Sequence, residues 1–180
     1  MKGIIFTEFL KMVEERYGLE TVDSIISATP LESKGIYTSV GTYNYSEMLS
    51  LLATLSSTTN TEINKLVYTY GLYFFSVIEN SYKNIIETYG SSFDLISSIE
   101  NHIHVHVRKI YPDAELPSFI TREKKTNRLV IEYQSDRAMH SFAQGLMERT
   151  IEHYQENIRL EKSILVPDGT KVLFTLSKDA

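Results

Sequence analysis

The sequence predicts an α+β fold, in which a helical N-terminal subdomain packs on a C-terminal antiparallel sheet with one helix. Three observations predict this class. Apolar residues recur every three or four positions through the first two-thirds of the chain, as on one face of a helix. Residues 129–133 then follow a strand-like alternation, and Pro167-Asp168-Gly169 forms a turn sequence between two further strand-like runs. No Gly-, Ser- or Pro-rich linker divides the two parts, so we expect residues 1–180 to form a single domain.

The helical part is expected to contain five helices. The first covers residues 5–17, with Gly18 as its stop signal. The others are expected over residues 22–28, 45–55, 62–89 and 92–111, with a loop at residues 31–44. The fourth helix carries apolar residues on most faces, which predicts burial among other helices. Ser91 or Ser92 is expected to cap the fifth.

The C-terminal third is expected to contain a strand at residues 129–133, a helix at 139–157, and strands at 158–166 and 171–176. The basic run at residues 122–125, next to Thr126-Asn127, is interpreted as a solvated turn.

Composition excludes several function classes. The chain has no cysteine, which rules out disulfides, Cys-ligated metals and thiol catalysis. Its net charge of −5 and its lack of a large basic cluster argue against nucleic-acid binding. The apolar start at Ile4-Ile5-Phe6 is interrupted by Glu8 and Lys11, so no signal peptide is predicted. No apolar stretch is long enough to span a bilayer, and a soluble cytoplasmic protein without a membrane partner is expected.

The most informative motif is a Y-x-S-x-R triplet formed by Tyr133, Ser135 and Arg137. In an extended segment, side chains two residues apart point the same way, so the three can converge on one object. A guanidinium fork binds carboxylates and phosphates bidentately, and the two hydroxyls add neutral donors. The triplet is therefore a candidate anion clamp, although a surface strand that ends in a solvated arginine has the same pattern.

Three histidines, His102, His104 and His106, permit two interpretations. A strand would place all three imidazoles on one face as a metal cup, which would suit a metal-dependent hydrolase. Apolar residues at 96, 99, 103, 107 and 110 follow helical spacing instead and favour a helix. On that helix His104 lies at the flank of the apolar stripe, whereas His102 and His106 share the other flank and could chelate a metal.

A histidine that faces an apolar space also supplies what a haem iron needs, a neutral imidazole nitrogen in a dry pocket. The propionates of a haem need an anion clamp, which the triplet provides. With these features the chain resembles the H-NOX family, the haem nitric oxide/oxygen-binding domains that include the haem domain of soluble guanylate cyclase and stand-alone bacterial sensors. The resemblance extends over the whole chain and includes the opening Met1-Lys2-Gly3-Ile4-Ile5, Leu116-Pro117 and Gly145-Leu146.

The resemblance implies roles for individual residues. His104 would be the axial ligand of a haem b iron, and the triplet would hold the propionates. Pro117 would press on the porphyrin and help to keep it non-planar. The distal pocket would be lined by Ile5, Phe9, Phe74, Ile78, Phe142 and Leu146.

The resemblance also bears on ligand selectivity. Oxygen-binding members carry a distal tyrosine at the position that matches Phe142, which has no hydrogen-bond donor. O₂ would lose a hydrogen bond worth about 0.5–3 kcal/mol without a donor. We therefore expect NO and CO binding without a stable O₂ complex, unless Tyr70, Tyr73 or His140 places a donor in the pocket.

The implied signal is rupture of the bond between iron and His104 when NO binds, followed by rearrangement of the haem and helices. No kinase, cyclase or phosphodiesterase module is visible, so the chain is expected not to be an enzyme. Its partner would be a histidine kinase or a cyclic-di-GMP enzyme. The alternative function is the three-histidine hydrolase that uses His102, His104 and His106.

Overall fold

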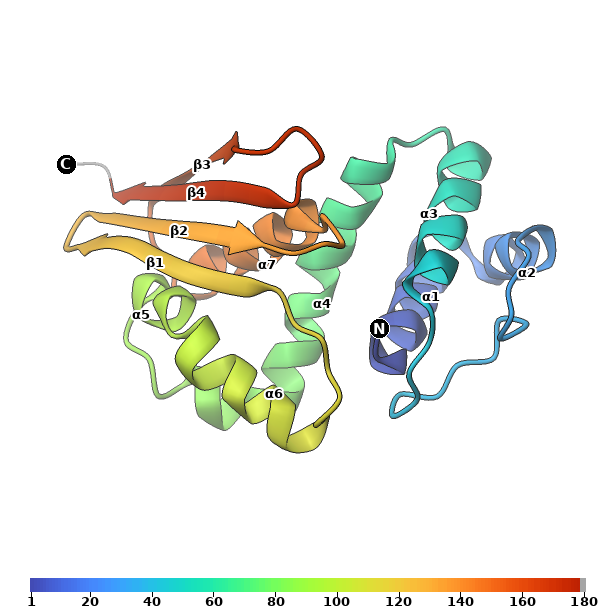
Figure 1. Ribbon diagram of the computed structural model, residues 1–180, viewed down its shortest axis with the longest axis horizontal. Coiled ribbons are helices and arrows are strands. Elements are labelled where there is room, and N and C mark those ends of the chain that lie inside the picture. The colour runs from blue at the N-terminus through green and yellow to red at the C-terminus, as the bar shows by residue number, and fades with distance from the viewer. Residues whose placement is uncertain (179–180) are drawn as a thin grey trace.

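The computed structural model describes residues 1–178 and confirms the α+β class. Figure 1 shows a helical lobe at one end, a sheet at the other and the long helix α4 between them. The elements are α1 (Gly3–Tyr17), α2 (Leu19–Ala28), α3 (Tyr45–Thr59), α4 (Ile63–Ile86), α5 (Ser92–Ser97), the π-helical turn η1 (Ile99–Ile103), α6 (His104–Ile110), β1 (Ser118–Lys125), β2 (Arg128–Gln134), α7 (His140–His153), β3 (Ile158–Ile164) and β4 (Lys171–Lys178).

The sheet is antiparallel with the strand order β1-β2-β4-β3. Apolar side chains of β2 and β4 pack against α5 and α7, which gives the sheet one buried face. A second core, built around Phe6, Phe9 and Leu51, fills the lobe of α1–α3 and extends onto α4. Within residues 1–178, no helix combines the length and apolarity that a bilayer crossing requires.

Helices α4 and α7 cross at two glycines, and this crossing fixes one wall of the site described below. A Cβ atom added to Gly71 would lie 2.2 Å from the Phe142 carbonyl oxygen, and one on Gly145 would lie 2.4 Å from the Tyr68 carbonyl oxygen. Neither position can hold a larger side chain unless the helices move apart. The close approach places Phe74 of α4 beside Phe142 of α7, with ring centroids 5.5 Å apart.

The predicted elements are present with shifted bounds. Helix α2 begins three residues earlier than predicted, and α3 continues through Thr59, where Ser57, Thr58 and Thr59 donate hydrogen bonds to carbonyls four residues back. Helix α7 ends at His153, four residues early, and Gln155 then has a φ of +54°. Ser91 caps α5 through its side chain, as predicted.

Two sequence-based expectations were wrong. Residues 122–125 form the second half of β1, and the turn is confined to Thr126-Asn127. This strand lies at the sheet edge, where charged side chains stay exposed, so its pairing with β2 rather than its own pattern makes it a strand. The expected helix over 92–111 is interrupted by η1, which divides it into α5 and α6 immediately before His104.

Candidate haem site

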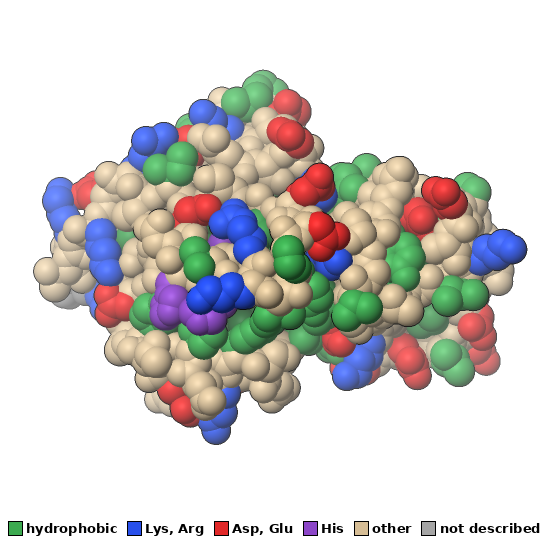
Figure 2. Space-filling view, turned by 60° about the horizontal axis from the view of Figure 1, so that its bottom comes forward, with side chains coloured by type: hydrophobic (Ala, Val, Ile, Leu, Met, Phe, Trp, Pro, Cys, Tyr) green, Lys and Arg blue, Asp and Glu red, His purple; other side chains and the backbone are tan. Residues whose placement is uncertain are grey.

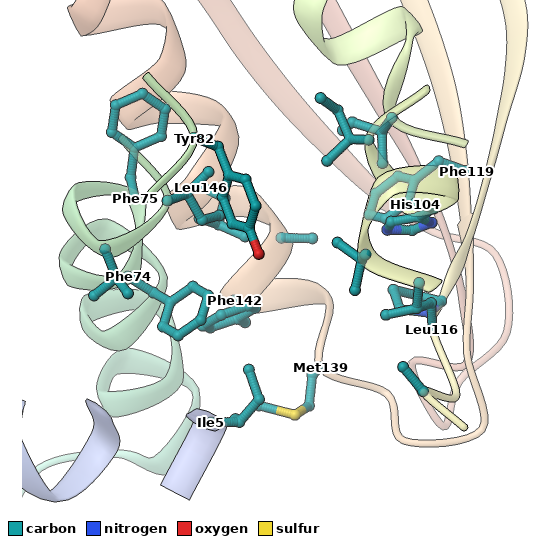
Figure 3. Close-up of a pocket in the computed structure, with 18 of the residues that line it drawn as sticks. Ile5, Phe74, Phe75, Tyr82, His104, Leu116, Phe119, Met139, Phe142 and Leu146 are labelled. Atoms are coloured by element: carbon teal, nitrogen blue, oxygen red, sulfur yellow. The ribbon is translucent and has the colours of Figure 1, made fainter. Parts of the chain in front are cut away.

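A cavity of about 300 Å³ lies between the wall of α4 and α7 and the opposite wall of η1, α6 and β1. This volume is at the lower end of the roughly 300–1,000 Å³ that small-molecule sites span. Figure 3 shows Phe74, Phe142 and Leu146 on the first wall and His104, Leu116 and Phe119 on the second. Figure 2 shows hydrophobic side chains gathered between the two lobes, beside histidine and basic side chains. The cavity is therefore mainly apolar, with a few polar groups.

His104 begins α6 directly after the π-helical turn and is 7% exposed. A π-helical turn changes the direction of the side chains that follow it, and such turns are frequent at functional sites. The Nδ1 atom of His104 is buried and has no hydrogen-bond partner, although Glu100 Oε2 lies 3.5 Å away. Burial lowers the pKa of His104, and the Glu100 carboxylate opposes that shift only in part. The cavity wall thus contains a buried, neutral imidazole.

Glu100 holds this histidine in position and was not identified from the sequence. Its carboxylate accepts a hydrogen bond of 3.0 Å from the Phe119 backbone N–H and lies 3.6 Å from Arg108. These contacts connect η1, α6 and β1 behind the imidazole. The only sequence signal is its position four residues before His104, where side chains meet on a helix.

His102 and His106 do not join His104 in a metal cup. The rings of His102 and His106 lie 4.8 Å apart. His102 Nδ1 is hydrogen-bonded to the Tyr89 hydroxyl, and His106 Nδ1 to the His102 carbonyl oxygen at 3.0 Å. Residues 1–178 contain no group of three His, Asp or Glu side chains placed to hold a metal ion. Without such a group in the described residues, the three-histidine hydrolase has no structural basis.

Tyr133, Ser135 and Arg137 all line the cavity, but strand alternation does not bring them together. Strand β2 ends at Gln134, and Ser135 and Arg137 lie in the tight turn that follows. The Arg137 backbone N–H donates to Ser135 Oγ at 3.2 Å within this turn. Tyr133 is 2% exposed, and burial raises the pKa of its hydroxyl.

Arg137 already binds a carboxylate. Its Nη2 forms an ion pair with Glu115 Oε2, and its Nη1 donates to the Glu115 carbonyl oxygen at 2.9 Å. The Tyr45 hydroxyl donates to the Arg137 carbonyl oxygen at 2.7 Å and fixes the backbone of the turn. Arg137 therefore presents its guanidinium as an anion clamp at the cavity edge.

Most of the apolar residues expected in the pocket line the cavity. They are Ile5, Phe74, Ile78, Pro117, Phe142 and Leu146. The expectation that Phe9 lines the pocket was wrong. Its fully buried ring packs in the core of the helical lobe, 5.5 Å from the ring of Tyr70. Phe9 shares a face of α1 with Ile5 but lies one turn further along the helix, where that face packs on Tyr70 instead of the cavity.

The donors considered from the sequence lie outside the cavity. The Tyr70 hydroxyl donates to the Ile5 carbonyl oxygen at 2.7 Å, and the Tyr73 hydroxyl faces Glu15 at 3.3 Å. His140 lies beside Ser141 and Lys162.

A hydroxyl that the sequence analysis missed lies in the cavity instead. Tyr82 has non-helical dihedral angles (φ −131°, ψ 29°) at a kink in α4, and Figure 3 shows its hydroxyl directed into the cavity. It forms no hydrogen bond with any residue of the described range 1–178. No proline marks the kink, and no pattern in the sequence indicates this orientation.

These residues fit a haem. An apolar slot suits the porphyrin, a buried neutral imidazole suits the iron, and a guanidinium that binds a carboxylate suits a propionate.

Comparison with known proteins agrees with this fit. The family model described as Haem-NO-binding matches residues 2–162. The structure of the unliganded Fe(II) H-NOX protein from K. algicida is similar at 53% identity and a TM-score of 0.96, with 100% of this chain and 97% of that chain covered. An H-NOX from Shewanella woodyi, solved in the Fe(II)CO state with IWP-051 bound, is 35% identical, with 99% and 95% covered and a TM-score of 0.84.

A curated relative is larger than this chain. Soluble guanylate cyclase gcy-33 of Caenorhabditis elegans is 27% identical over 168 residues, which cover 89% of this chain and 17% of that protein. Because the family model covers nearly the whole chain, this protein belongs to the haem-NO-binding (H-NOX) family, whose members are haem-binding gas-sensor domains and not catalytic domains.

Proposed function

We propose that this chain is a sensor of NO and CO that holds haem b with His104 as the axial ligand of the iron. The observation that carries the proposal is the buried His104 imidazole in the wall of an apolar cavity. Glu100 Oε2 lies 3.5 Å from its Nδ1, which leaves Nε2 as the ring nitrogen for a ligand. The lowered pKa keeps the imidazole in the neutral form that can bind a metal.

Glu100 supports this assignment. A histidine that ligates a metal usually directs its other ring nitrogen to a carboxylate or carbonyl, which fixes the ring orientation. Glu100 Oε2, 3.5 Å from Nδ1, is placed for that role and leaves Nε2 as the nitrogen available to iron.

The propionates would be held by Tyr133, Ser135 and Arg137. Arg137 binds the Glu115 carboxylate, and a propionate has the same charge and geometry. Glu115 is 81% exposed at its side chain, so it can leave Arg137 to a propionate and remain solvated. Pro117 and the apolar residues of the α4–α7 wall would contact the faces of the porphyrin.

Discrimination against O₂ would follow from the wall opposite His104. Phe74 and Phe142 carry no donor, and the Tyr70 hydroxyl is already bonded to the Ile5 carbonyl oxygen. NO and CO depend little on a donor, whereas a polar O₂ ligand lacks a hydrogen bond worth about 0.5–1.5 kcal/mol. Tyr82 is the residue that tests this argument, because its hydroxyl lies in the cavity.

The signal would begin at His104. A bound haem would supply a ferrous iron that takes NO or CO. Rupture of the bond between that iron and His104 would leave His104 and α6 free to shift, together with Pro117 and the segment before β1. The helical lobe can then move against the sheet lobe, which makes a two-state switch that the ligand biases. We propose a histidine kinase or a cyclic-di-GMP enzyme as the partner that distinguishes the two states.

The test is an absorption spectrum of the anaerobic reduced protein before and after addition of NO, CO and air. The proposal predicts a Soret band that shifts with NO and CO, and a spectrum in air without a stable oxygenated form. Equal autophosphorylation rates of a cognate kinase with unliganded and NO-treated protein would reject kinase signalling, while leaving haem binding intact.

A further inference from the structure

A cluster of polar residues that begins at Lys2, in the lining of the cavity, connects two segments that are far apart in the sequence. Lys2 Nζ donates to both carboxylate oxygens of Asp113, at 3.0 and 3.2 Å. Thr42 Oγ1 donates to Asp113 Oδ2 at 2.7 Å and accepts a hydrogen bond from Lys2 Nζ at 2.9 Å. We call Lys2, Thr42 and Asp113 the mouth cluster. One carboxylate thus accepts three hydrogen bonds from the helical lobe.

The two donors are held rigidly before they meet Asp113. Lys2 and Thr42 form an antiparallel bridge, and the flanking bonds Gly3 N to Gly41 O (2.8 Å) and Tyr43 N to Met1 O (2.9 Å) join the chain start to this loop. The Lys2 side chain is only 12% exposed. Its ammonium lies 5.5 Å from the centre of the Tyr111 ring, a cation–π contact with the end of α6.

The acceptor lies on the segment that follows the His104 helix. Helix α6 ends at Ile110, and Asp113 comes three residues later in a turn closed by the Ala114 N–H and the Tyr111 carbonyl oxygen at 3.0 Å. Two residues further on, Glu115 binds Arg137. This short segment therefore follows the histidine helix directly and contacts both the helical lobe and the anion clamp, so it can transmit a shift of α6 to the helical lobe.

We propose that Asp113 is a positioning residue that couples displacement of the His104 helix to the helical lobe through Lys2 and Thr42. This inference rests on the proposed function, because His104 must be released for a displacement to occur. The hydrogen bonds from Thr42 and Lys2 hold the pKa of the Asp113 carboxyl below its usual value, so the carboxylate is charged at neutral pH. An ion pair near the surface changes a two-state equilibrium by up to about fivefold.

The experiment compares hydrogen–deuterium exchange of residues 1–10 and 37–45 in the haem-loaded ferrous protein with and without NO. Variants Asp113→Asn and Thr42→Val each remove part of the mouth cluster and leave the cavity lining unchanged. Glu161→Gln is the matched control, because Glu161 forms an exposed ion pair with Arg159 on β3, away from both segments. Absorption spectra are recorded on the same samples.

We expect the wild type and Glu161→Gln to show an NO-dependent change in exchange that Asp113→Asn and Thr42→Val lose in large part. The NO-dependent change in absorption should persist in all four proteins. At 1 M salt, where the screening length falls to about 3 Å, the wild type should approach Asp113→Asn. An undiminished exchange change in both variants would overturn the inference, as would no exchange change in a wild type whose spectrum responds to NO. A wild type with no haem spectrum would instead reject the proposed function and this inference with it.

Discussion

Phe142→Tyr tests the proposed selectivity at one atom. Phe142 lies on the wall opposite His104, with its ring 5.1 Å from the ring of Tyr70 and 5.5 Å from that of Phe74. The Tyr70 hydroxyl gives its proton to the Ile5 carbonyl oxygen, so it does not donate to a new hydroxyl at position 142. We expect that new hydroxyl to donate to a ligand in the cavity.

One neutral hydrogen bond is worth about 0.5–1.5 kcal/mol, which corresponds to an increase of about two- to thirteenfold in O₂ affinity. NO affinity should change less, because NO binding does not depend on this donor. The assay is O₂ and CO binding followed by absorption after flash photolysis, with the ratio of the two affinities as the readout. The ratio cancels changes in pocket volume that affect both gases.

Tyr82→Phe, alone and combined with Phe142→Tyr, is the control for the hydroxyl that already lies in the cavity. We expect Tyr82→Phe alone to change the ratio of O₂ affinity to CO affinity little. A wild-type protein that forms a stable oxygenated spectrum in air would refute the argument. Loss of that spectrum in Tyr82→Phe would then assign the donor to Tyr82 instead.

Three further predictions follow from the site. In the haem-free protein, burial keeps His104 neutral below its usual pKa, so the folded state binds fewer protons than the unfolded chain once the pH falls below about 6.5. The free energy of unfolding should therefore fall from pH 7.5 to 5.5, and less so in His104→Leu, as urea titrations can measure. Gly71→Ala places a Cβ atom 2.2 Å from the Phe142 carbonyl oxygen, so we expect the free energy of unfolding, measured by urea titration, to fall by about 1–3 kcal/mol and the CO spectrum to change. An unchanged free energy of unfolding and an unchanged spectrum would contradict the close helix crossing. Arg137→Gln should speed transfer of haem to an apo-globin acceptor several-fold, whereas Glu115→Gln should slow it by removing a competing carboxylate; equal rates in both would argue against the clamp.

The sequence predicted most helices and three of the four strands because the apolar residues of these elements recur at regular spacing. Strand β1 was missed because its exposed, charged outer half carries no such pattern. Its identity as a strand comes from pairing with β2, for example between Phe119 and Tyr133, and such pairing is not local in sequence. Helix ends shifted by a few residues where hydroxyl side chains or a positive φ decided the end, as at Thr59 and Gln155.

The sequence predicted which residues form the candidate site better than it predicted how the fold places them. His104 is buried as its flank position required, but the π-helical turn that orients it has no sequence signature here. Arg137 reaches the cavity from a turn and not from a strand. Strand alternation therefore predicted correctly that Tyr133, Ser135 and Arg137 lie together, but for the wrong structural reason. Glu100 and Tyr82 became visible only when η1 and the α4 kink placed them beside the cavity.

Titration of the apoprotein with hemin, with His104 intact and with His104→Gly, shows whether His104 binds the haem iron. Imidazole added to His104→Gly replaces the missing side chain without the bond to α6. We expect a Soret band in the wild type, a changed band in His104→Gly, and recovery of the wild-type band when imidazole is added. A wild type without a Soret band, or a His104→Gly protein with the same band as the wild type, would contradict it.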